Sequence, residues 1–371
     1  MMTGKAAGGA NKDTTGDPER TRRKRAPRFK EIAEAASVSE ATVDRVLNER
    51  GSVSATARQR VVEAAQRLGV QRILPDTRHG IIHFDLLMPI NDTPFFKRLE
   101  QSLQRAIAML DRRIIFHRVH LKNNDDAGYV RAILHPPYKR SGLIVVSASA
   151  PRIAAALRKV IDAGETVVAL VSQLPGIPGC HYTGIDNERA GHTAGYMIGR
   201  LMPASASVPE RGKVLILSAF HDFPAHRQRV AGCIQALSHS GAAHQVHHVE
   251  KETFDDPDIC FRIVSDALKR SRIAAIYNTG EGSAGIANAL EKRGAGQDVI
   301  WVAHEMHDEH RVLLTQGTLD LVIDQDPDRQ ALCALQQLLY AAQQVAQAPP
   351  GPLGDFSLFM QPNVRMTPYL S

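Results

Sequence analysis

The sequence predicts a small all-α head with a helix-turn-helix, followed by an α/β body of two doubly wound parallel-sheet lobes. Three observations support this prediction. Short amphipathic helices begin at Phe29, strand and helix patterns alternate from residue 81 onward, and the excess of positive charge is confined to residues 1–80. The predicted parts are a disordered basic leader, the helix-turn-helix, a hinge or linker, and the body, over residues 1–27, 28–70, 71–79 and 80–371.

Three short helices are predicted in the head. Apolar residues recur at helical spacing in each of them: Ile32, Ala33 and Ala36, then Val43, Val46 and Leu47, then Val61, Val62, Ala65 and Leu68. Ser39 and Ser54 are placed to cap the second and third helices, and Gly69 is placed to end the third. The first two elements therefore form a helix, a tight turn and a helix.

In the body, apolar strands alternate with amphipathic helices, a pattern typical of parallel sheets with crossover helices. Strands are expected over 81–88, 113–119, 142–146, 166–171, 213–217, 242–249, 273–277, 299–303 and 356–360. Helices are expected over 96–110, 153–163, 190–201, 230–238, 260–268 and 285–292. The polar stretch 184–187 divides the pattern, which predicts two lobes with a cleft between them.

The charge is distributed unevenly along the chain. Residues 1–80 hold 16 Lys and Arg against 10 Asp and Glu, whereas the remainder holds 29 of each. A basic end on a neutral body favours a polyanionic partner such as nucleic acid. A solvated basic tail accounts for residues 20–30 equally well.

The cysteines and apolar runs bear on the compartment. The four cysteines form no C-x-x-C pair, which predicts buried thiols in a reducing compartment: Cys180, Cys233, Cys260 and Cys333. Residues 1–27 hold no apolar run that could serve as a secretory signal, and no later stretch is long enough to span a bilayer. A cytoplasmic protein is therefore expected.

The segment from Arg28 to Asn48, with Val53-Ser54 after it, resembles the DNA-binding head of the lac-repressor-type (LacI/GalR) family. The resemblance implies that the second helix enters the major groove of an operator, where its side chains meet base edges and small hydroxyls contact phosphates. The DNA-binding residues it implies are Ser39, Glu40, Ala41, Thr42, Arg45, Asn48 and, in the hinge, Leu74. A generic three-helix bundle is the alternative.

Two positions depart from the family's pattern. Asp44 stands where a small hydroxyl residue is usual, so we expect its carboxylate to orient Arg45 or to accept from a cytosine amine. The hinge is short, and Pro75 prevents a normal helix from running through it. Leu74 remains the candidate for a wedge in the minor groove, and packing of Leu74 on the body is the alternative.

Nearly all of residues 80–365 resemble the family's effector-binding domain, which shares its fold with periplasmic sugar-binding proteins. The resemblance implies a homodimeric operator-binding regulator, expected to be a repressor, that is controlled by a small polar effector of sugar or polyol type. The residues expected to contact the effector are Phe95, Arg227, Asn278, Glu305 and Gln325.

Two other functions are weighed. Gly280 to Gly285 spells G-x-G-x-x-G, the fingerprint of a dinucleotide-dependent oxidoreductase, but Glu281 would oppose the pyrophosphate it should cradle. A plain sugar-binding protein is disfavoured by the basic head and the missing export signal. We therefore expect no catalysis and no cofactor.

Two groups of histidines have spacings that a metal could use: His244, His247 and His248, and His304, His307 and His310. No cysteine ligand accompanies either group, so both are interpreted as solvated histidines. No metal site is predicted.

Overall fold

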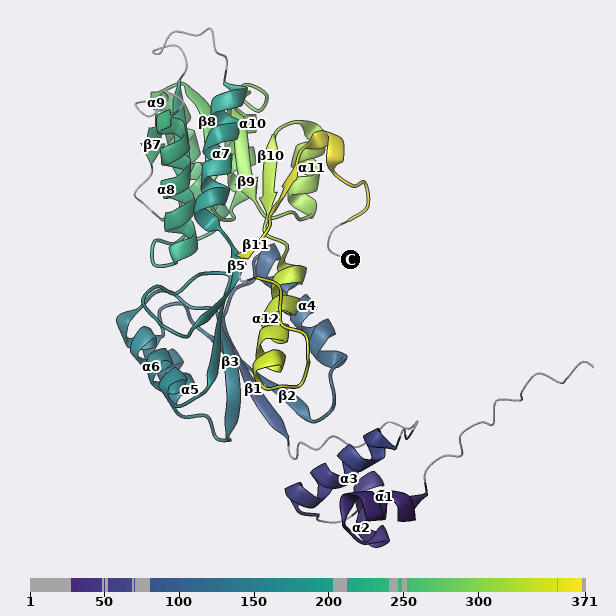
Figure 1. Cartoon of the computed structure of the whole chain (residues 1–371). Helices are drawn as coiled ribbons and strands as arrows, with labels where there is room; N and C mark the ends of the chain where they lie inside the picture. The colour runs from purple at the N-terminus through teal and green to yellow at the C-terminus, as the bar shows by residue number, and fades with distance from the viewer. Residues whose placement is uncertain are drawn as a thin grey trace, which may run out of the picture. The chain divides into compact units, whose positions relative to one another are not determined.

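The computed structural model describes residues 28–48, 50, 53–68, 70, 81–202, 212–239, 246–248, 252–351 and 353–368. The chain divides into two compact units, Met1–Gly80 and Ile81–Ser371, which are described separately (Figure 1). The predictions made for the leader (1–27) and for the hinge (71–79), including Leu74, lie outside the described residues.

The head is the predicted helix-turn-helix with a third helix behind it. Its helices are α1 (Phe29–Ala36), α2 (Glu40–Leu47) and α3 (Ala55–Arg67). Ser37 adopts a left-handed conformation (φ 53°) that ends α1, and the Ser39 hydroxyl caps α2 by accepting from the Thr42 amide. The predicted apolar faces form the head's core, except that Leu68 is 39% exposed and Ala64 is buried.

The body holds two sheets, one in each lobe, as predicted, and each sheet has six strands. The strand order is β11-β5-β4-β3-β1-β2 in the N-terminal lobe and β12-β10-β9-β8-β6-β7 in the C-terminal lobe. All the recorded strand pairs are parallel except β10 with β12. The strands are β1 (Ile82–Pro89), β2 (Ile114–Leu121), β3 (Arg140–Val145), β4 (Thr166–Leu170), β5 (His181–Ile185), β6 (Lys213–Leu217), β7 (Val246–His248), β8 (Ile273–Asn278), β9 (Ile300–His304), β10 (Leu321–Asp324), β11 (Leu353–Gly354) and β12 (Ser357–Phe359).

Helices cover both faces of each sheet, and each sheet accordingly has two apolar cores. The N-terminal lobe carries α4 (Pro94–Ala108), α5 (Asp126–Leu134), α6 (Pro151–Asp162) and α12 (Pro327–Ala341). The C-terminal lobe carries α7 (Asn187–Leu201), α8 (Pro224–His239), α9 (Pro257–Arg270), α10 (Ser283–Arg293) and α11 (Asp308–Gln316). A short 3-10 helix (Gln361–Asn363) follows β12.

Several elements are absent from the sequence prediction: β5, β10, β11, α5, α11 and α12. The short ones have weak patterns, but α12 shows a clear signal. Asp326 caps it, Pro327 starts it, and its buried residues recur at helical spacing. It packs against β3, β4 and α4, so a segment late in the chain completes the N-terminal lobe (Figure 1).

The chain passes between the lobes three times. The first passage follows β5 at Asp186, the second follows β10 at Gln325 and Asp326, and the third joins β11 to β12. The first passage lies in the polar stretch 184–187. There the side chain of Asp186 accepts from the backbone amide of Arg189 and so caps the start of α7. This arrangement confirms the predicted pair of lobes.

Glycines allow α7 and α8 to pack closely. A Cβ at Gly191 would lie 2.0 Å from the Arg229 carbonyl oxygen. Gly232 faces α7 in the same way, 2.1 Å from the Glu188 carbonyl oxygen. The contact fixes the backbone of Arg229, whose side chain belongs to the site described below.

Gly191→Ala is expected to lower the free energy of unfolding by about 1–3 kcal/mol, because the added methyl must push the two helices apart. Alanine's higher helix propensity, worth about 1 kcal/mol, offsets only part of this cost. Urea unfolding followed by circular dichroism measures the change. Gly296→Ala is the control, since its Cβ would lie 3.8 Å from the nearest side-chain atom; equal stability of the two variants would contradict the close-packing argument.

Candidate functional site

A cavity of about 70 Å³ lies in the body where the two lobes face each other. It is lined by residues of both lobes, among them Phe95 and Ser172 of the N-terminal lobe and Arg229 and Glu281 of the C-terminal lobe. A more open hollow of about 440 Å³ shares several of its lining residues, including Asn91 and Glu281. Open α/β sheets bind ligands beyond the carboxyl ends of their strands, and the cavity lies in that position.

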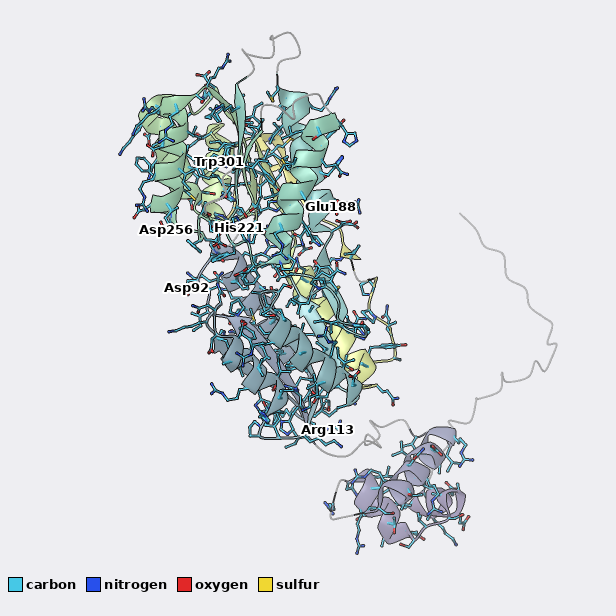
Figure 2. All side chains as sticks on the ribbon, turned by 90° about the vertical axis from the view of Figure 1, so that its left-hand side faces the viewer. Asp92, Arg113, Glu188, His221, Asp256 and Trp301 are labelled. Atoms are coloured by element: carbon cyan, nitrogen blue, oxygen red, sulfur yellow. The ribbon has the colours of Figure 1, made fainter. Side chains whose placement is uncertain are left out.

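Aromatic rings supply the apolar part of the lining. Phe95 and Phe96 begin α4 and meet edge to face, with centroids 5.3 Å apart. Phe220 and Phe223 come from the loop before α8, with centroids 5.8 Å apart. Figure 2 places the labelled His221 of the same loop near the junction of the lobes. Rings from both lobes therefore line the cavity.

Arg229 is the cavity's buried cation, with an exposed fraction of 3%. Its Nε donates to Oδ1 of Asn187 at 2.9 Å, and its Nη1 donates to the carbonyl oxygen of Thr279 at 2.8 Å. These bonds hold the guanidinium in place. Its Nη2 makes no recorded hydrogen bond within the described residues and remains available to an acceptor on a ligand.

Three carboxylates line the cavity together with this one arginine: Asp255, Glu281 and Glu305. Asp255 and Glu305 have left-handed backbones (φ 59° and φ 68°), a strained conformation that often marks functional sites. Burial raises the pKa of Asp255 to about 7 and that of Glu305 to about 8, and it also raises the pKa of Glu281. The lining is thus rich in hydrogen-bonding groups.

Several buried polar atoms of the lining have no hydrogen-bond partner within the described part of the chain: Asn123 Oδ1, Ser172 Oγ, Glu281 Oε1, His304 Nδ1, Glu305 Oε2 and Gln325 Oε1. Leaving such atoms unsatisfied is costly, at about 1–3 kcal/mol each, and the cost calls for an explanation. A polar ligand in the cavity can pair with several of them.

The residues expected to contact an effector divide into two sets. Phe95, Glu305 and Gln325 line the cavity, and Gln325 donates to Oε1 of Glu305. Asn278 is absent from the lining; its amide is buried and donates to the carbonyl oxygens of Gly280 and Glu281. It shapes the loop after β8.

Arg227 lies outside the cavity. It is exposed and donates to the carbonyl oxygen of His221, whereas Arg229 lines the cavity. The reason is helical phase. Ala225, Arg229 and Cys233 lie on the buried face of α8, and Arg227 points away from it. The spacing of these residues was the signal in the sequence that could have identified Arg229.

The glycines between Gly280 and Gly285 have packing roles. A Cβ at Gly285 would lie 1.8 Å from the carbonyl oxygen of Pro257, so α10 can approach α9 only through glycine. Gly282 has φ 94°, a conformation that favours glycine. Neither role requires a dinucleotide.

The interpretation of His304, His307 and His310 as solvated is wrong. Their exposed fractions are 0%, 3% and 0%; His304 ends β9, and His307 and His310 lie at the start of α11. Burial lowers the pKa of His307 to about 4 and that of His310 to about 3, so both rings are neutral near pH 7. The side chains of His244, His247 and His248 lie outside the described residues.

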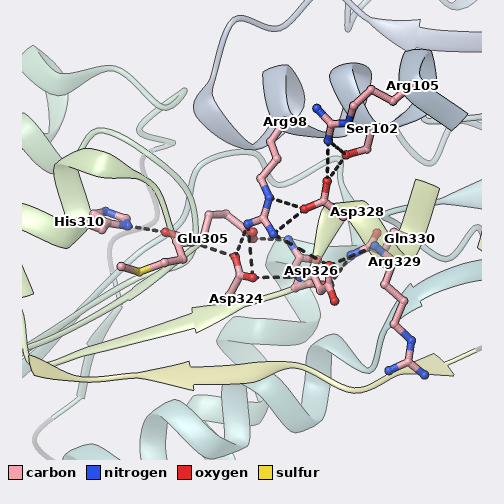
Figure 3. A network of polar contacts seen from close by, with 12 residues as sticks. Arg98, Ser102, Arg105, Glu305, His310, Asp324, Asp326, Asp328, Arg329 and Gln330 are labelled. Carbon is pink, nitrogen blue, oxygen red and sulfur yellow. Dashed lines mark hydrogen bonds and ion pairs between the residues drawn. The ribbon is translucent and has the colours of Figure 1, made fainter. Parts of the chain in front are cut away.

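A group of ion pairs joins the two lobes at the second passage of the chain (Figure 3). Arg98 of α4 lies 3.3 Å from Oδ1 of Asp324 at the end of β10, and 2.7 Å from Oδ2 of Asp328 in α12. Asp324 also accepts from the Met306 amide at 2.9 Å. Since Gln325 follows Asp324 directly, these pairs fix the backbone that carries a lining residue.

On the head, α2 presents an exposed surface that includes Ala41 and Arg45. The hydroxyls of Ser39 and Thr42 lie 2.9 Å apart, within the helix cap. Oδ1 of Asp44 accepts from the side-chain amide of Asn48 at 2.6 Å, whereas the sequence suggested Arg45 or a cytosine amine as its partner. Arg45 itself is exposed on α2.

The comparisons with known proteins agree with this architecture. Residues 84–346 match the family described as periplasmic binding protein domain, and residues 28–71 match the bacterial regulatory proteins of the lacI family. The HTH-type transcriptional regulator MalR of Streptomyces coelicolor is 40% identical over 82 residues, which are 22% of this chain and 23% of MalR. Reg1 of Streptomyces lividans is 39% identical over 80 residues, and the chain spans only 23% of its length as well.

Solved structures resemble the body. GanP, a glucose-galactose binding protein from Geobacillus stearothermophilus, gives a TM-score of 0.65 at 16% identity, covering 78% of this chain and 100% of GanP. A solute binding protein of an ABC transporter from Bacillus halodurans, with bound myo-inositol, gives 0.66 at 17% identity, covering 77% and 96%. At these identities the likeness shows the fold.

No helix among the described residues has both the length and the apolar character needed to cross a membrane. The chain belongs to the periplasmic binding protein domain family, and its head belongs to the lacI family of bacterial regulatory proteins.

Proposed function

We propose that this protein is a transcriptional regulator whose head binds operator DNA and whose cleft binds a small polar effector. The observation that carries the proposal is the joining of a lacI-type helix-turn-helix to a binding-protein body in one chain. A plain sugar-binding protein has no use for such a head. The glycines between Gly280 and Gly285, on which the oxidoreductase hypothesis rests, have packing roles that require no dinucleotide.

The effector that fits the cleft best is a sugar or a polyol. Phenylalanine rings of both lobes offer flat apolar faces, while carboxylates and amides accept from hydroxyl donors and Arg229 donates. Similar folds that bind glucose, galactose or myo-inositol support this class. The four cavity residues that we propose as effector contacts are Phe95, Arg229, Glu305 and Gln325.

The proposed action is repression by a homodimer in the cytoplasm, where the operator is found. Two heads would bind half-sites about one helical turn apart. Effector binding would shift the lobes and thereby the DNA affinity, through a coupling of about 1–3 kcal/mol.

Thermal denaturation of the full chain, with glucose, galactose, allose, tagatose, myo-inositol and NAD as separate additions, tests the effector class. A bound sugar or polyol stabilises the protein by mass action, by about 2.7 kcal/mol at a hundredfold excess over Kd. We expect at least one sugar or polyol to raise the melting temperature and NAD to leave it unchanged. A saturable response to NAD alone would favour the oxidoreductase.

Arg45→Ala is expected to weaken operator binding by about 1–3 kcal/mol and to relax the preference at one base pair, because an exposed arginine on α2 can pair with a guanine edge. Fluorescence anisotropy on operator variants selected from random DNA measures both effects. Arg60→Ala, an exposed change on α3, is the control and should weaken all sequences alike. Uniform weakening by Arg45→Ala would assign Arg45 to phosphate.

A further inference from the structure

Two histidines and one carboxylate form a buried cluster beside the cleft. Glu281 comes from the loop after β8, and His307 and His310 come from the start of α11. Their exposed fractions are 9%, 3% and 0%. One donor atom from each lies within 4.8 Å of the others. Residues far apart in the sequence thus present nitrogen and oxygen donors to one point.

Two atoms of the cluster are buried without a hydrogen bond. His307 Nε2 lies 3.4 Å from Oε2 of Glu281, too far for a good hydrogen bond. Neither His307 Nε2 nor Glu281 Oε1 has a hydrogen-bond partner among the described residues. Buried polar atoms of this kind indicate a missing partner at the cluster.

The third donor is prepared by its surroundings. Nδ1 of His310 lies 2.6 Å from the carbonyl oxygen of Glu305, which can only accept, so Nδ1 carries the proton (Figure 3). Nε2 therefore holds a lone pair, which the Ser283 hydroxyl contacts at 2.6 Å. A carbonyl that fixes the tautomer in this way is the usual second partner of a metal-binding histidine.

We propose that Glu281, His307 and His310 form a binding site for a divalent transition-metal ion of the Zn²⁺ type. In a tetrahedral zinc site, bonds of about 2.0–2.1 Å place neighbouring donors roughly 3.4 Å apart. His307 Nε2 and Glu281 Oε2 already have this separation, at 3.4 Å. Nε2 of His310, the third donor, reaches the ion by a shift on the order of 1 Å, and the Ser283 hydroxyl turns away from it.

The chemistry of the donors selects the metal. Imidazole nitrogens suit Zn²⁺, Co²⁺ and Ni²⁺, whereas Mg²⁺ and Ca²⁺ prefer oxygen ligands only. Three protein donors leave one coordination position open. Since Glu281 also lines the cavity, that ion would lie next to a bound effector.

The test uses the untagged full chain, freed of metal with EDTA and titrated with Zn²⁺ against a chromophoric chelator. One ion per chain should bind with a Kd below about 1 μM, which corresponds to about −8 kcal/mol. Co²⁺ in place of Zn²⁺ should give the intense visible absorption of a tetrahedral site. Zn²⁺ diffused into crystals should give an anomalous peak between Glu281, His307 and His310.

His307→Gln and His310→Gln should each weaken this binding by at least tenfold, and His192→Gln, an exposed change, should leave it unchanged. If a variant fails to fold, the anomalous peak in the unaltered protein still decides the question. Anomalous peaks at exposed histidines only, or equal Zn²⁺ affinity of all three variants, would overturn the proposal. Because no DNA or sugar is present, either result leaves the proposed regulatory function untouched.

Discussion

Arg229→Met is expected to weaken binding of the effector found by thermal denaturation by about 30- to 100-fold, equivalent to ~2–3 kcal/mol. The substitution keeps the apolar stem and removes the guanidinium, so a ligand acceptor paired with Nη2 loses a charged donor that is only 3% exposed. Titration calorimetry measures the change. The variant should also melt earlier, because Asn187 and Thr279 lose the donor that bonds them.

Arg227→Met is the matched control. Arg227 lies on the same helix, but its side chain is exposed and bonds the carbonyl oxygen of His221. We expect its effector affinity to stay within about twofold of the unaltered protein, as for most surface changes. A loss of affinity in Arg227→Met, with Arg229→Met unaffected, would place the effector against the other face of α8 and refute the site.

This pair of arginines shows where sequence reasoning about the site stops. Glu305 and Gln325 were expected from the family resemblance, and both directly follow strands whose ends converge on the cleft. On a helix, two arginines that are two residues apart differ in the face of the helix on which they lie, and only the helical phase tells which face is buried. The phase of α8 follows from Ala225 and Cys233, which are buried, so the information was present in the sequence. Asp255 carried no such signal, because it lies in a loop.

The fold was easier to predict than the site because periodicity repeats over many residues. β1 buries a continuous run of residues, and α4 buries one stripe along its surface. Such patterns extend over many residues, so a wrong assignment at one position does not hide them. The burial of His307 and His310 depends instead on how the chain packs after β9, and no local pattern encodes it. Because no cysteine accompanies them, these histidines were interpreted as solvated.

Arg98→Met is expected to lower the free energy of unfolding by about 3 kcal/mol, because it leaves the carboxylate of Asp324, which is 4% exposed, without its cation. Burial raises the pKa of Asp324, and the charge of Arg98 opposes that rise. Urea unfolding of the body measures the loss. Arg105→Met is the control: its side chain is 62% exposed, and its pair with Asp328 should contribute at most about 0.5 kcal/mol.

The double variant Arg98→Met with Asp324→Asn distinguishes the ion pair from simple packing. If the penalty of the single variant is an unpaired buried charge, removing that charge as well should restore stability to within about 1 kcal/mol, since the amide oxygen can still accept from Met306. A double variant as unstable as the single one would assign the loss to the missing arginine stem. Effector affinity should follow the same pattern, because Asp324 fixes the backbone beside Gln325: weakened in Arg98→Met and recovered in the double variant.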